Sequence, residues 1–235
     1  MADEACALDG AVIAFDLDGT LVDTAPDLVE TLNVLLAQEG VAPLPLAEAR
    51  PFIGRGARWL IERGFAEAGA PLDAGRVPAL FDRFIAHYLA HIADQSRPFP
   101  GVEAALDRLK AMGAKLCVCT NKRTDLSVAL LDAVGLAGWF DAVIGADAAP
   151  ASKPDPRHLT FAIDTLGGAH DRAILVGDAA PDAGAARAAG VALILVSFGY
   201  TETPVRELSP DILIDHYDEL PDACRRLLGA CGARA

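Results

Sequence analysis

The chain has 235 residues, of which 52% are hydrophobic, and its formal net charge at pH 7 is −13. This hydrophobic content excludes a disordered chain, and the acidic balance argues against nucleic acid or an anionic membrane surface as a partner. No apolar run approaches the roughly 20 residues that span a bilayer, and the chain starts with acidic residues where a secretory signal would be basic. We therefore expect a cytoplasmic protein.

The first predicted element is a short buried strand over residues 12–15, Val-Ile-Ala-Phe. Asp16 and Asp18 follow it, and a Gly-Thr turn comes next. Two carboxylates spaced by two residues at a strand end point to the same side, so their like charges need compensation. A divalent cation or a proton shared with a substrate would supply it. Acidic turn residues also cap helices, so this stretch alone leaves a structural role open.

Residues 22–95 are predicted to form several helices and no strand. Pro26 and Asp27 are typical of a first helical turn, and leucines then recur at intervals of three and four residues. Segments containing Gly and Pro, near residues 40–45 and 69–71, separate the helices. We expect this part of the chain to be an inserted helical cap domain.

From about residue 97 onward, apolar strands alternate with helices, which predicts a parallel sheet covered on both faces. The strand over 12–15 belongs to the same sheet, so the expected fold is a doubly wound α/β core, residues 1–21 and 96–235, interrupted by the cap at 22–95. The later strands are expected at 114–119, 142–145, 173–176, 192–196 and 212–214. The helices are expected at 101–112, 124–135, 156–167, 181–189 and 218–228.

Polar side chains follow four of these strands, at the edge of an open parallel sheet where ligands bind. They are carboxylates, a hydroxyl, an amide and lysines: Asp16, Asp18, Thr120, Asn121, Lys122, Lys153, Asp178 and Asp182. A phosphoryl group would use all of these, since hydroxyl, amide and lysine groups hold its oxygens and its charge. Carboxylates suit Mg²⁺, and either Asp16 or Asp18 could attack phosphorus while the other transfers a proton.

Four segments of the chain resemble the four motifs of the haloacid dehalogenase superfamily. They are Asp16-Leu-Asp-Gly-Thr20, Thr120-Asn121, Ser152-Lys153-Pro154 and Gly177-Asp178-(x)3-Asp182, with the helical cap between the first and the second. Residues 15–24, 54–57 and 120–122 are most similar to the phosphoglycolate phosphatase branch. The resemblance implies a Rossmann-like α/β core and a Mg²⁺-dependent phosphomonoester hydrolase that acts through an aspartyl-phosphate. The expected partner is a small phosphorylated metabolite, with 2-phosphoglycolate favoured, and the expected assembly is a monomer or a homodimer.

The resemblance also implies roles for individual residues. Asp16 would be the nucleophile, Asp18 the general acid and base, and Lys153 would steady the nucleophile and the transferred charge. Mg²⁺ would be held by Asp16, by the backbone carbonyl of Asp18, by Asp178 and by Asp182, directly or through water. The presence of Asp18 argues against the halide-displacing branch, which lacks that acid.

The expected phosphate and substrate contacts come from the turn after the first strand, the second motif and the cap: Gly19, Thr120, Asn121, Lys122, Arg55 and Arg58. Thr120 and Asn121 would hold phosphoryl oxygens. In the cap segment Gly54-Arg-Gly-Ala-Arg58, glycines could let backbone N–H groups approach a substrate carboxylate, with an arginine pairing to it. The alternative is a helix start with solvated arginines.

One position departs from the family pattern. Ala179 stands where a serine is common, which removes a hydroxyl that could support the metal carboxylates, and we expect a weaker site that remains active. Other enzymes stay open: a phosphatase for sugar phosphates, nucleotides or pyrophosphate, or a sugar phosphomutase. A receiver-like signalling switch is a non-enzymatic alternative, but its phospho-accepting aspartate follows a later strand and its domain has no cap.

Overall fold

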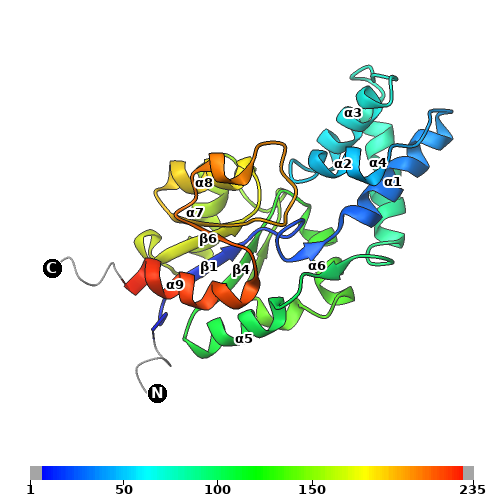
Figure 1. Cartoon of the computed structure of the whole chain (residues 1–235). Coiled ribbons are helices and arrows are strands. Elements are labelled where there is room, and N and C mark those ends of the chain that lie inside the picture. The colour runs from blue at the N-terminus through cyan, green and yellow to red at the C-terminus, as the bar shows by residue number, and fades with distance from the viewer. Residues whose placement is uncertain (1–6, 230–235) are drawn as a thin grey trace.

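The computed structural model of the chain describes residues 7–229 (Figure 1). The first six residues, whose acidic character contributed to the expected cytoplasmic location, lie outside this range. Among the helices of residues 7–229, none combines the length and the apolar character that crossing a membrane requires.

A six-stranded parallel sheet forms the centre of the molecule, as predicted. The strand order is β5-β4-β1-β6-β7-β8, so the first strand lies in the middle with a partner on each side. The bounds are β1 (Val12–Phe15), β4 (Lys115–Cys119), β5 (Ala142–Ile144), β6 (Ala173–Gly177), β7 (Ala192–Val196) and β8 (Ile212–Ile214). Because β1 is central, the residues that follow it lie at the middle of the sheet edge.

Side chains along β1 alternate between the two faces of the sheet, as the pleat requires. Ile13 and Phe15 pack into the hydrophobic cluster beneath α5 (Val102–Ala111), α6 (Thr124–Ala133) and α9 (Leu220–Gly229). Val12 and Ala14 pack instead against α7 (Pro156–Thr165) and α8 (Ala180–Ala189). Both faces are therefore covered, which explains the nearly continuous apolar strands.

The helices between residues 25 and 90 form most of a second hydrophobic cluster, which also includes Leu126 of α6 and Tyr200. They are α1 (Ala25–Gln38), α2 (Leu46–Ala49), α3 (Ala57–Glu67) and α4 (Val77–Ala90), and Figure 1 shows them together beyond one end of the sheet. Short 3-10 helices lie at Arg50–Phe52, Ala137–Trp139, His170–Arg172, Val205–Leu208 and Tyr217–Glu219. We call α1–α4 the cap helices below.

The prediction that residues 22–95 contain no strand is wrong at one place. β2 (Val22–Asp23) pairs antiparallel with β3 (Arg97–Pro98), so the two connections to the cap helices run side by side. A ribbon of two residues in each strand leaves no periodic pattern in the sequence, because it is formed by the meeting of two distant segments. Elsewhere the ends of the core strands and helices agree with the predicted ones to within two residues.

A buried carboxylate ties these two connections together. Asp27, in the first turn of α1, accepts hydrogen bonds from the backbone N–H of Gln95 at 3.0 and 3.1 Å and of Ser96 at 2.8 Å. The Ser96 hydroxyl donates to the same carboxylate at 2.6 Å. The start of the cap helices and their return to the sheet are thus fixed to each other by one side chain.

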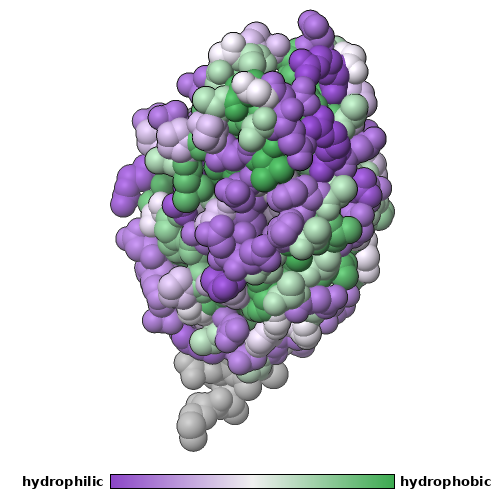
Figure 2. Space-filling model, turned by 90° about the vertical axis from the view of Figure 1, so that its right-hand side faces the viewer, coloured by the Kyte–Doolittle hydropathy of each residue, from purple (hydrophilic) through white to green (hydrophobic). Residues whose placement is uncertain are grey.

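The surface is a mixture of polar and apolar groups. Figure 2 shows mainly hydrophilic residues on the face it presents, with smaller apolar groups among them. Large exposed apolar side chains in the described range lie on different elements: Leu46, Leu89, Val128 and Phe161.

Candidate active site at the carboxyl edge of the sheet

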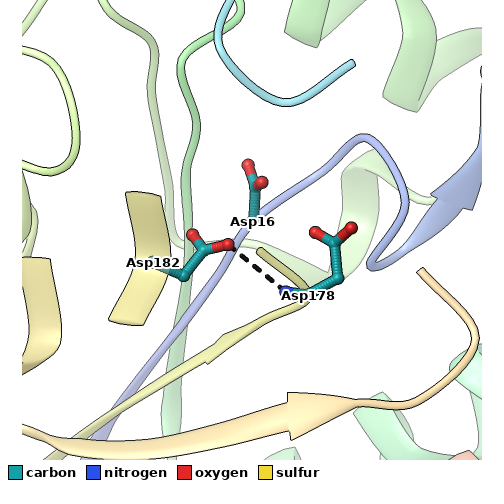
Figure 3. Close-up of side chains that lie close together, drawn as sticks. All are labelled: Asp16, Asp178 and Asp182. Atoms are coloured by element: carbon teal, nitrogen blue, oxygen red, sulfur yellow. Dashed lines mark hydrogen bonds between the residues drawn. The ribbon is translucent and has the colours of Figure 1, made fainter. Parts of the chain in front are cut away.

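Three buried carboxylates converge where β1 and β6 end. Asp16 follows β1, Asp178 follows β6, and Asp182 lies in the first turn of α8. One oxygen from each lies within 4.8 Å of the others, and Figure 3 shows the three side chains projecting from separate segments toward a common region. The strand order brings them together, since β1 and β6 are neighbours.

Lys153 lies between two of these carboxylates and is itself buried. Its Nζ is 3.0 Å from Asp16 Oδ1 and donates to Asp182 Oδ1 at 2.6 Å. Burial alone would lower the pKa of Lys153, but Asp16 and Asp182 raise it above its usual value, so the ammonium stays charged. The Asp16 contact is an ion pair only, and Asp16 Oδ1 has no hydrogen-bond donor among residues 7–229.

Burial raises the pKa of Asp16 to about 6, against the opposing attraction of Lys153. Repulsion from Asp182 and Asp18 adds to the increase. The pKa of Asp178 is also well above its usual value, first because of burial and then because of Asp182 and Asp16. The cluster therefore carries more negative charge than its surroundings neutralise.

The support of Asp178 and Asp182 comes mainly from backbone groups. Asp178 accepts from the Thr20 hydroxyl at 3.0 Å and from the Tyr200 N–H at 2.5 Å. Asp182 Oδ2 accepts from the N–H groups of Asp178 and Ala179, both at 3.2 Å. Ala179 thus supports the cluster through its backbone, and the weakening expected from its missing hydroxyl stays a prediction.

Asp18 has a lysine of its own. Lys122 Nζ donates to both Asp18 oxygens, at 2.8 and 2.9 Å, and the Thr24 hydroxyl donates to Oδ1 at 2.8 Å. The Lys122 Nζ also lies 4.5 Å from the ring centre of Tyr88, on α4. Burial alone would lower the pKa of Lys122, but the pairing with Asp18 raises it above its usual value. Asp16 and Asp18 are therefore held by different cations.

The second predicted motif lies on the loop after β4. Thr120 is buried, and its Oγ1 accepts from the Lys122 N–H at 3.3 Å. The Asn121 side-chain amide donates to the carbonyl of Lys153 at 3.0 Å and to that of Gly54 at 3.3 Å. Asn121 Oδ1 is buried and has no hydrogen-bond partner within the described range. Asn121 thus connects the sheet edge to the segment that precedes α3.

Gly19 has a conformational role in this structure. Its φ is +82°, and a Cβ there would lie 2.6 Å from Asp178 Oδ2 and 2.8 Å from the Tyr200 ring. Its N–H donates to the carbonyl of Val22 at 2.9 Å, which closes the turn. The predicted contact of Gly19 with phosphate stays a prediction.

A cavity of about 300 Å³ lies between the cap helices and the sheet edge. Polar side chains that line it include Asp18, Arg55, Arg58, Asn121 and Lys122. The Arg55 guanidinium lies over the Trp59 ring at 4.7 Å, and that of Arg58 lies over the Phe81 ring at 5.3 Å. Both arginines are exposed and border the cavity, so the geometry permits a substrate contact and equally permits solvated side chains.

The charges of the site test whether a divalent cation fits. When all four central carboxylates are ionised, they exceed the two ammonium groups by two negative charges: Asp16, Asp18, Asp178 and Asp182 against Lys122 and Lys153. One divalent cation would compensate this excess, and oxygen ligands suit a hard ion. The clustered oxygens of Asp16, Asp178 and Asp182 thus fit a metal ion.

The sequence analysis missed Tyr200, which contacts several parts of the site. Its N–H holds Asp178, and its hydroxyl bonds to Asp23 and accepts the Ala25 N–H at 3.1 Å. Arg50, in the 3-10 helix of the cap, lies over the Tyr200 ring at 4.7 Å. The sequence did contain an indication of this role, because Tyr200 follows the strand β7 at the same sheet edge.

Comparison with known proteins agrees with this geometry. A family model described as haloacid dehalogenase-like hydrolase matches residues 11–190. The chain belongs to the haloacid dehalogenase-like hydrolase family. A phosphoglycolate phosphatase of Caulobacter vibrioides is 61% identical over 226 residues, which are 96% of this chain and 95% of that one. A phosphoglycolate phosphatase of Mesorhizobium japonicum is 44% identical over 94% of this chain and 98% of its own.

The family assignment extends to solved structures. A crystal structure of a predicted phosphoglycolate phosphatase from Haemophilus somnus 129pt has a TM-score of 0.84 and 28% sequence identity, and the match covers 92% of this chain and 98% of that chain. The match includes the cap helices as well as the core, because it covers nearly all of both chains. This haloacid dehalogenase-like hydrolase therefore has the family fold that its four motifs predicted.

Proposed function

We propose that this haloacid dehalogenase-like hydrolase is a Mg²⁺-dependent phosphatase that converts 2-phosphoglycolate to glycolate and phosphate. One observation carries the proposal: Asp16 and Asp18 lie at one sheet edge, each paired with its own buried lysine, beside a cavity bordered by further cations. The names of the two curated relatives support the substrate. A dianionic phosphate with a carboxylate close by matches a cavity that contains both arginines and a lysine.

In the first step, a carboxylate oxygen of Asp16 attacks phosphorus, and the bond from phosphorus to the ester oxygen breaks. The Lys153 ammonium, 3.0 Å from Asp16 Oδ1, keeps the Asp16 carboxylate at the sheet edge and offsets its charge. Asp18, which carries the proton taken from water in the preceding turnover, gives it to the leaving oxygen, which departs as the hydroxyl of glycolate. The products of this step are an aspartyl-phosphate at Asp16 and an ionised Asp18.

In the second step, Asp18 accepts a proton from a water molecule, and the resulting hydroxide attacks the aspartyl-phosphate. The bond from phosphorus to the Asp16 oxygen breaks, so Asp16 is regenerated as phosphate forms. Lys153 stays paired with Asp16 and Asp182 and neutralises charge on the transferred group. The Thr120 hydroxyl would donate to another phosphoryl oxygen, and the Asn121 amide would do so after leaving the carbonyls of Lys153 and Gly54.

Mg²⁺ would be held by Asp16, the Asp18 carbonyl, Asp178 and Asp182. When bound, it would neutralise charge on the phosphoryl group and orient it. Both Asp182 oxygens already accept hydrogen bonds, so support of the metal through water fits Asp182 better than a direct bond. Asp178 has one donor on each oxygen and retains lone pairs for a metal ion.

The cap helices would close the cavity over the substrate and exclude water during the first step. Arg55 and Arg58 would then pair with the substrate carboxylate. Arg55→Ala or Arg58→Ala is expected to lower kcat/KM for 2-phosphoglycolate by roughly tenfold or more, with a smaller change for esters without a carboxylate. Unchanged substrate selectivity in both variants would show that the two arginines are solvated surface side chains that do not contact the substrate.

A substrate panel tests the proposed function directly. Phosphate release is measured from 2-phosphoglycolate, sugar phosphates, nucleotides and pyrophosphate, each with Mg²⁺ and with a chelator. We expect the highest kcat/KM for 2-phosphoglycolate and loss of turnover with the chelator. No release from any compound would refute the phosphatase proposal, whereas preference for another ester would refute only the substrate. Return of the phosphoryl group to a sugar would favour a phosphomutase.

Three further predictions from the sequence stand beside this proposal. We infer that residues 22–95 form a cap domain and that residues 1–21 and 96–235 form the core, supported by a hydrophobic cluster that consists mostly of cap-helix residues. The cytoplasmic location and the assembly as a monomer or a homodimer stay predictions.

A further inference from the structure

The Lys122–Asp18 ion pair presents a conflict with the role proposed for Asp18. A general acid must turn an oxygen toward the leaving group, yet the Lys122 ammonium donates to both Asp18 oxygens, at 2.8 and 2.9 Å. Thr24 occupies a further site on Oδ1. The Lys122 side chain is only 5% exposed, so water provides little competition for this pair. Lys122 must therefore release at least one oxygen before Asp18 can serve the ester oxygen.

The surroundings of Lys122 show where its ammonium can go. Lys122, Asp18 and Tyr88 all line the cavity between the sheet edge and the cap helices. Tyr88 presents its ring to the Lys122 ammonium, 4.5 Å from the ring centre, and its hydroxyl is buried near the same ammonium. An ammonium has three N–H donors, and Asp18 takes two of them. A further anion in the cavity would thus find a donor already present.

The position of Lys122 in the chain relates it to the substrate. Thr120 and Asn121, the two residues before it, are proposed to hold phosphoryl oxygens. The part of the substrate attached to the ester oxygen then extends into the cavity, toward Lys122. In 2-phosphoglycolate one methylene separates the ester oxygen from the carboxylate, so a carboxylate at Lys122 places the ester oxygen near Asp18.

We propose that Lys122 couples recognition of the substrate to the positioning of Asp18. In the free enzyme Lys122 holds both Asp18 oxygens, and when a phosphate monoester with a carboxylate on the adjacent carbon binds, the ammonium pairs with that carboxylate. One Asp18 oxygen is then released toward the ester oxygen. This inference rests on the proposed function, because it assigns the substrate carboxylate a second role beyond binding.

The exchange favours one class of substrate. When the carboxylate replaces an Asp18 oxygen, the buried ammonium stays paired, whereas an uncharged substituent offers it no new partner, and a buried charge without a partner is strongly disfavoured. Asp18 therefore stays held when the substituent is uncharged. The discrimination appears in kcat, since it concerns the transfer step, in addition to any effect on KM.

The wild-type enzyme gives the first test. Ethyl phosphate has a methyl group in place of the carboxylate of 2-phosphoglycolate and is otherwise the same ester. We expect kcat to be roughly 100-fold higher or more for 2-phosphoglycolate. Equal kcat values, with the two substrates differing only in KM, would overturn the inference. Because this comparison uses no variant, it does not depend on the folding of a mutant.

The second test removes the ammonium. Lys122→Met removes the ammonium that holds Asp18, so kcat for ethyl phosphate is expected to rise by roughly tenfold, whereas kcat/KM for 2-phosphoglycolate is expected to fall by roughly tenfold or more because its carboxylate loses a partner. Lys122→Arg keeps a cation and is expected to retain a preference of about tenfold or more for 2-phosphoglycolate. A loss of the same size on both substrates in Lys122→Met, or no change on either, would overturn the inference.

Lys110→Met is the matched control, because Lys110 also pairs with an aspartate at 2.8 Å, Asp141, but does so on the surface away from the cavity. Both activities are expected to stay within about twofold of the wild type. Failure of the proposed function has a different signature, since the wild type would then show no turnover of 2-phosphoglycolate. An active and selective wild type with an equally selective Lys122→Met variant would overturn only the role of Lys122.

Discussion

Asp16 and Asp18 are two residues apart, yet each is paired with a different lysine. Lys153 contacts Asp16, and Lys122 contacts Asp18, so the two carboxylates have separate electrostatic surroundings. Different surroundings are what allow neighbouring carboxylates to take different roles in one reaction. The first acts as nucleophile and the second transfers the proton in the proposed mechanism.

A buried histidine gives a prediction about pH at the scale of one residue. His158 is fully buried on α7, with Nε2 3.2 Å from the Ile144 carbonyl, and burial lowers its pKa to about 4, with a smaller contribution from Lys153. In the unfolded chain a histidine titrates near pH 6.5. As pH falls below that value the unfolded chain binds a proton that the folded protein does not, so stability falls.

As pH falls from 8 to 5, protonation of this histidine in the unfolded chain should lower the free energy of unfolding by about 2 kcal/mol. In His158→Gln, which can still donate to the Ile144 carbonyl, that part of the pH dependence is expected to disappear. Urea unfolding of both proteins at the two pH values measures it. The same pH dependence in the variant and in the wild type would show that His158 does not contribute.

At the scale of elements, the paired connections between sheet and cap depend on Asp27. Its carboxylate accepts the N–H groups of Gln95 and Ser96 and the Ser96 hydroxyl. Asp27→Ala leaves these buried donors unsatisfied and is expected to lower the free energy of unfolding by about 2–4 kcal/mol. Glu30→Ala, at an exposed position of the same helix, is the control and should stay within about 0.5 kcal/mol.

Urea denaturation compares the two variants with the wild type. A loss in Asp27→Ala no greater than the loss in Glu30→Ala would contradict the role of Asp27 in joining the two connections. The comparison is matched because both substitutions remove a carboxylate from α1.

The sheet and its edge could be predicted because their signals are local. Buried strands such as residues 12–15 are short apolar runs, and Asp16 or Asp178 follows such a run directly. Fold class and family are thereby confirmed, whereas the roles of the individual site residues await experiment.

What the sequence did not reveal depends on contacts between distant segments. Tyr200 bonds to Asp23 across 177 positions, and the ribbon of β2 and β3 forms only when the two connections meet. The Lys122–Asp18 pair joins residues 104 positions apart, and nothing in the local pattern around Lys122 indicates its partner. Residue types at strand ends are thus predictable, but their pairing is decided by tertiary structure.

At the scale of the whole molecule, the excess negative charge of the site links stability to metal and pH. The pKa of Asp16 is raised to about 6, so the metal-free folded protein holds protons that the unfolded chain releases between about pH 4 and pH 6. The proton on Asp16 therefore stabilises the metal-free fold at the acid end of that range, and this stabilisation is lost as pH rises through 6. Mg²⁺ should offset the loss by replacing the proton.

Mg²⁺ is therefore expected to raise the melting temperature more at about pH 8 than at about pH 5, where binding must displace protons. At a Mg²⁺ concentration about a hundred times Kd, the added stability is about 2.7 kcal/mol. Asp178→Asn should remove most of the increment. Thermal melts with MgCl2 and with a chelator measure it, and an increment that is equal at the two pH values would contradict the account.

The central claim is that Asp16 takes the phosphoryl group. The most direct measurement mixes the enzyme rapidly with 2-phosphoglycolate labelled in the phosphoryl group, quenches the mixture in acid, and locates the label by peptide mapping. The account predicts a phosphorylated intermediate at Asp16 and none in Asp16→Asn, whose turnover should fall by roughly 10⁴-fold or more. Label on another residue, or turnover in Asp16→Asn at the wild-type rate, would contradict it.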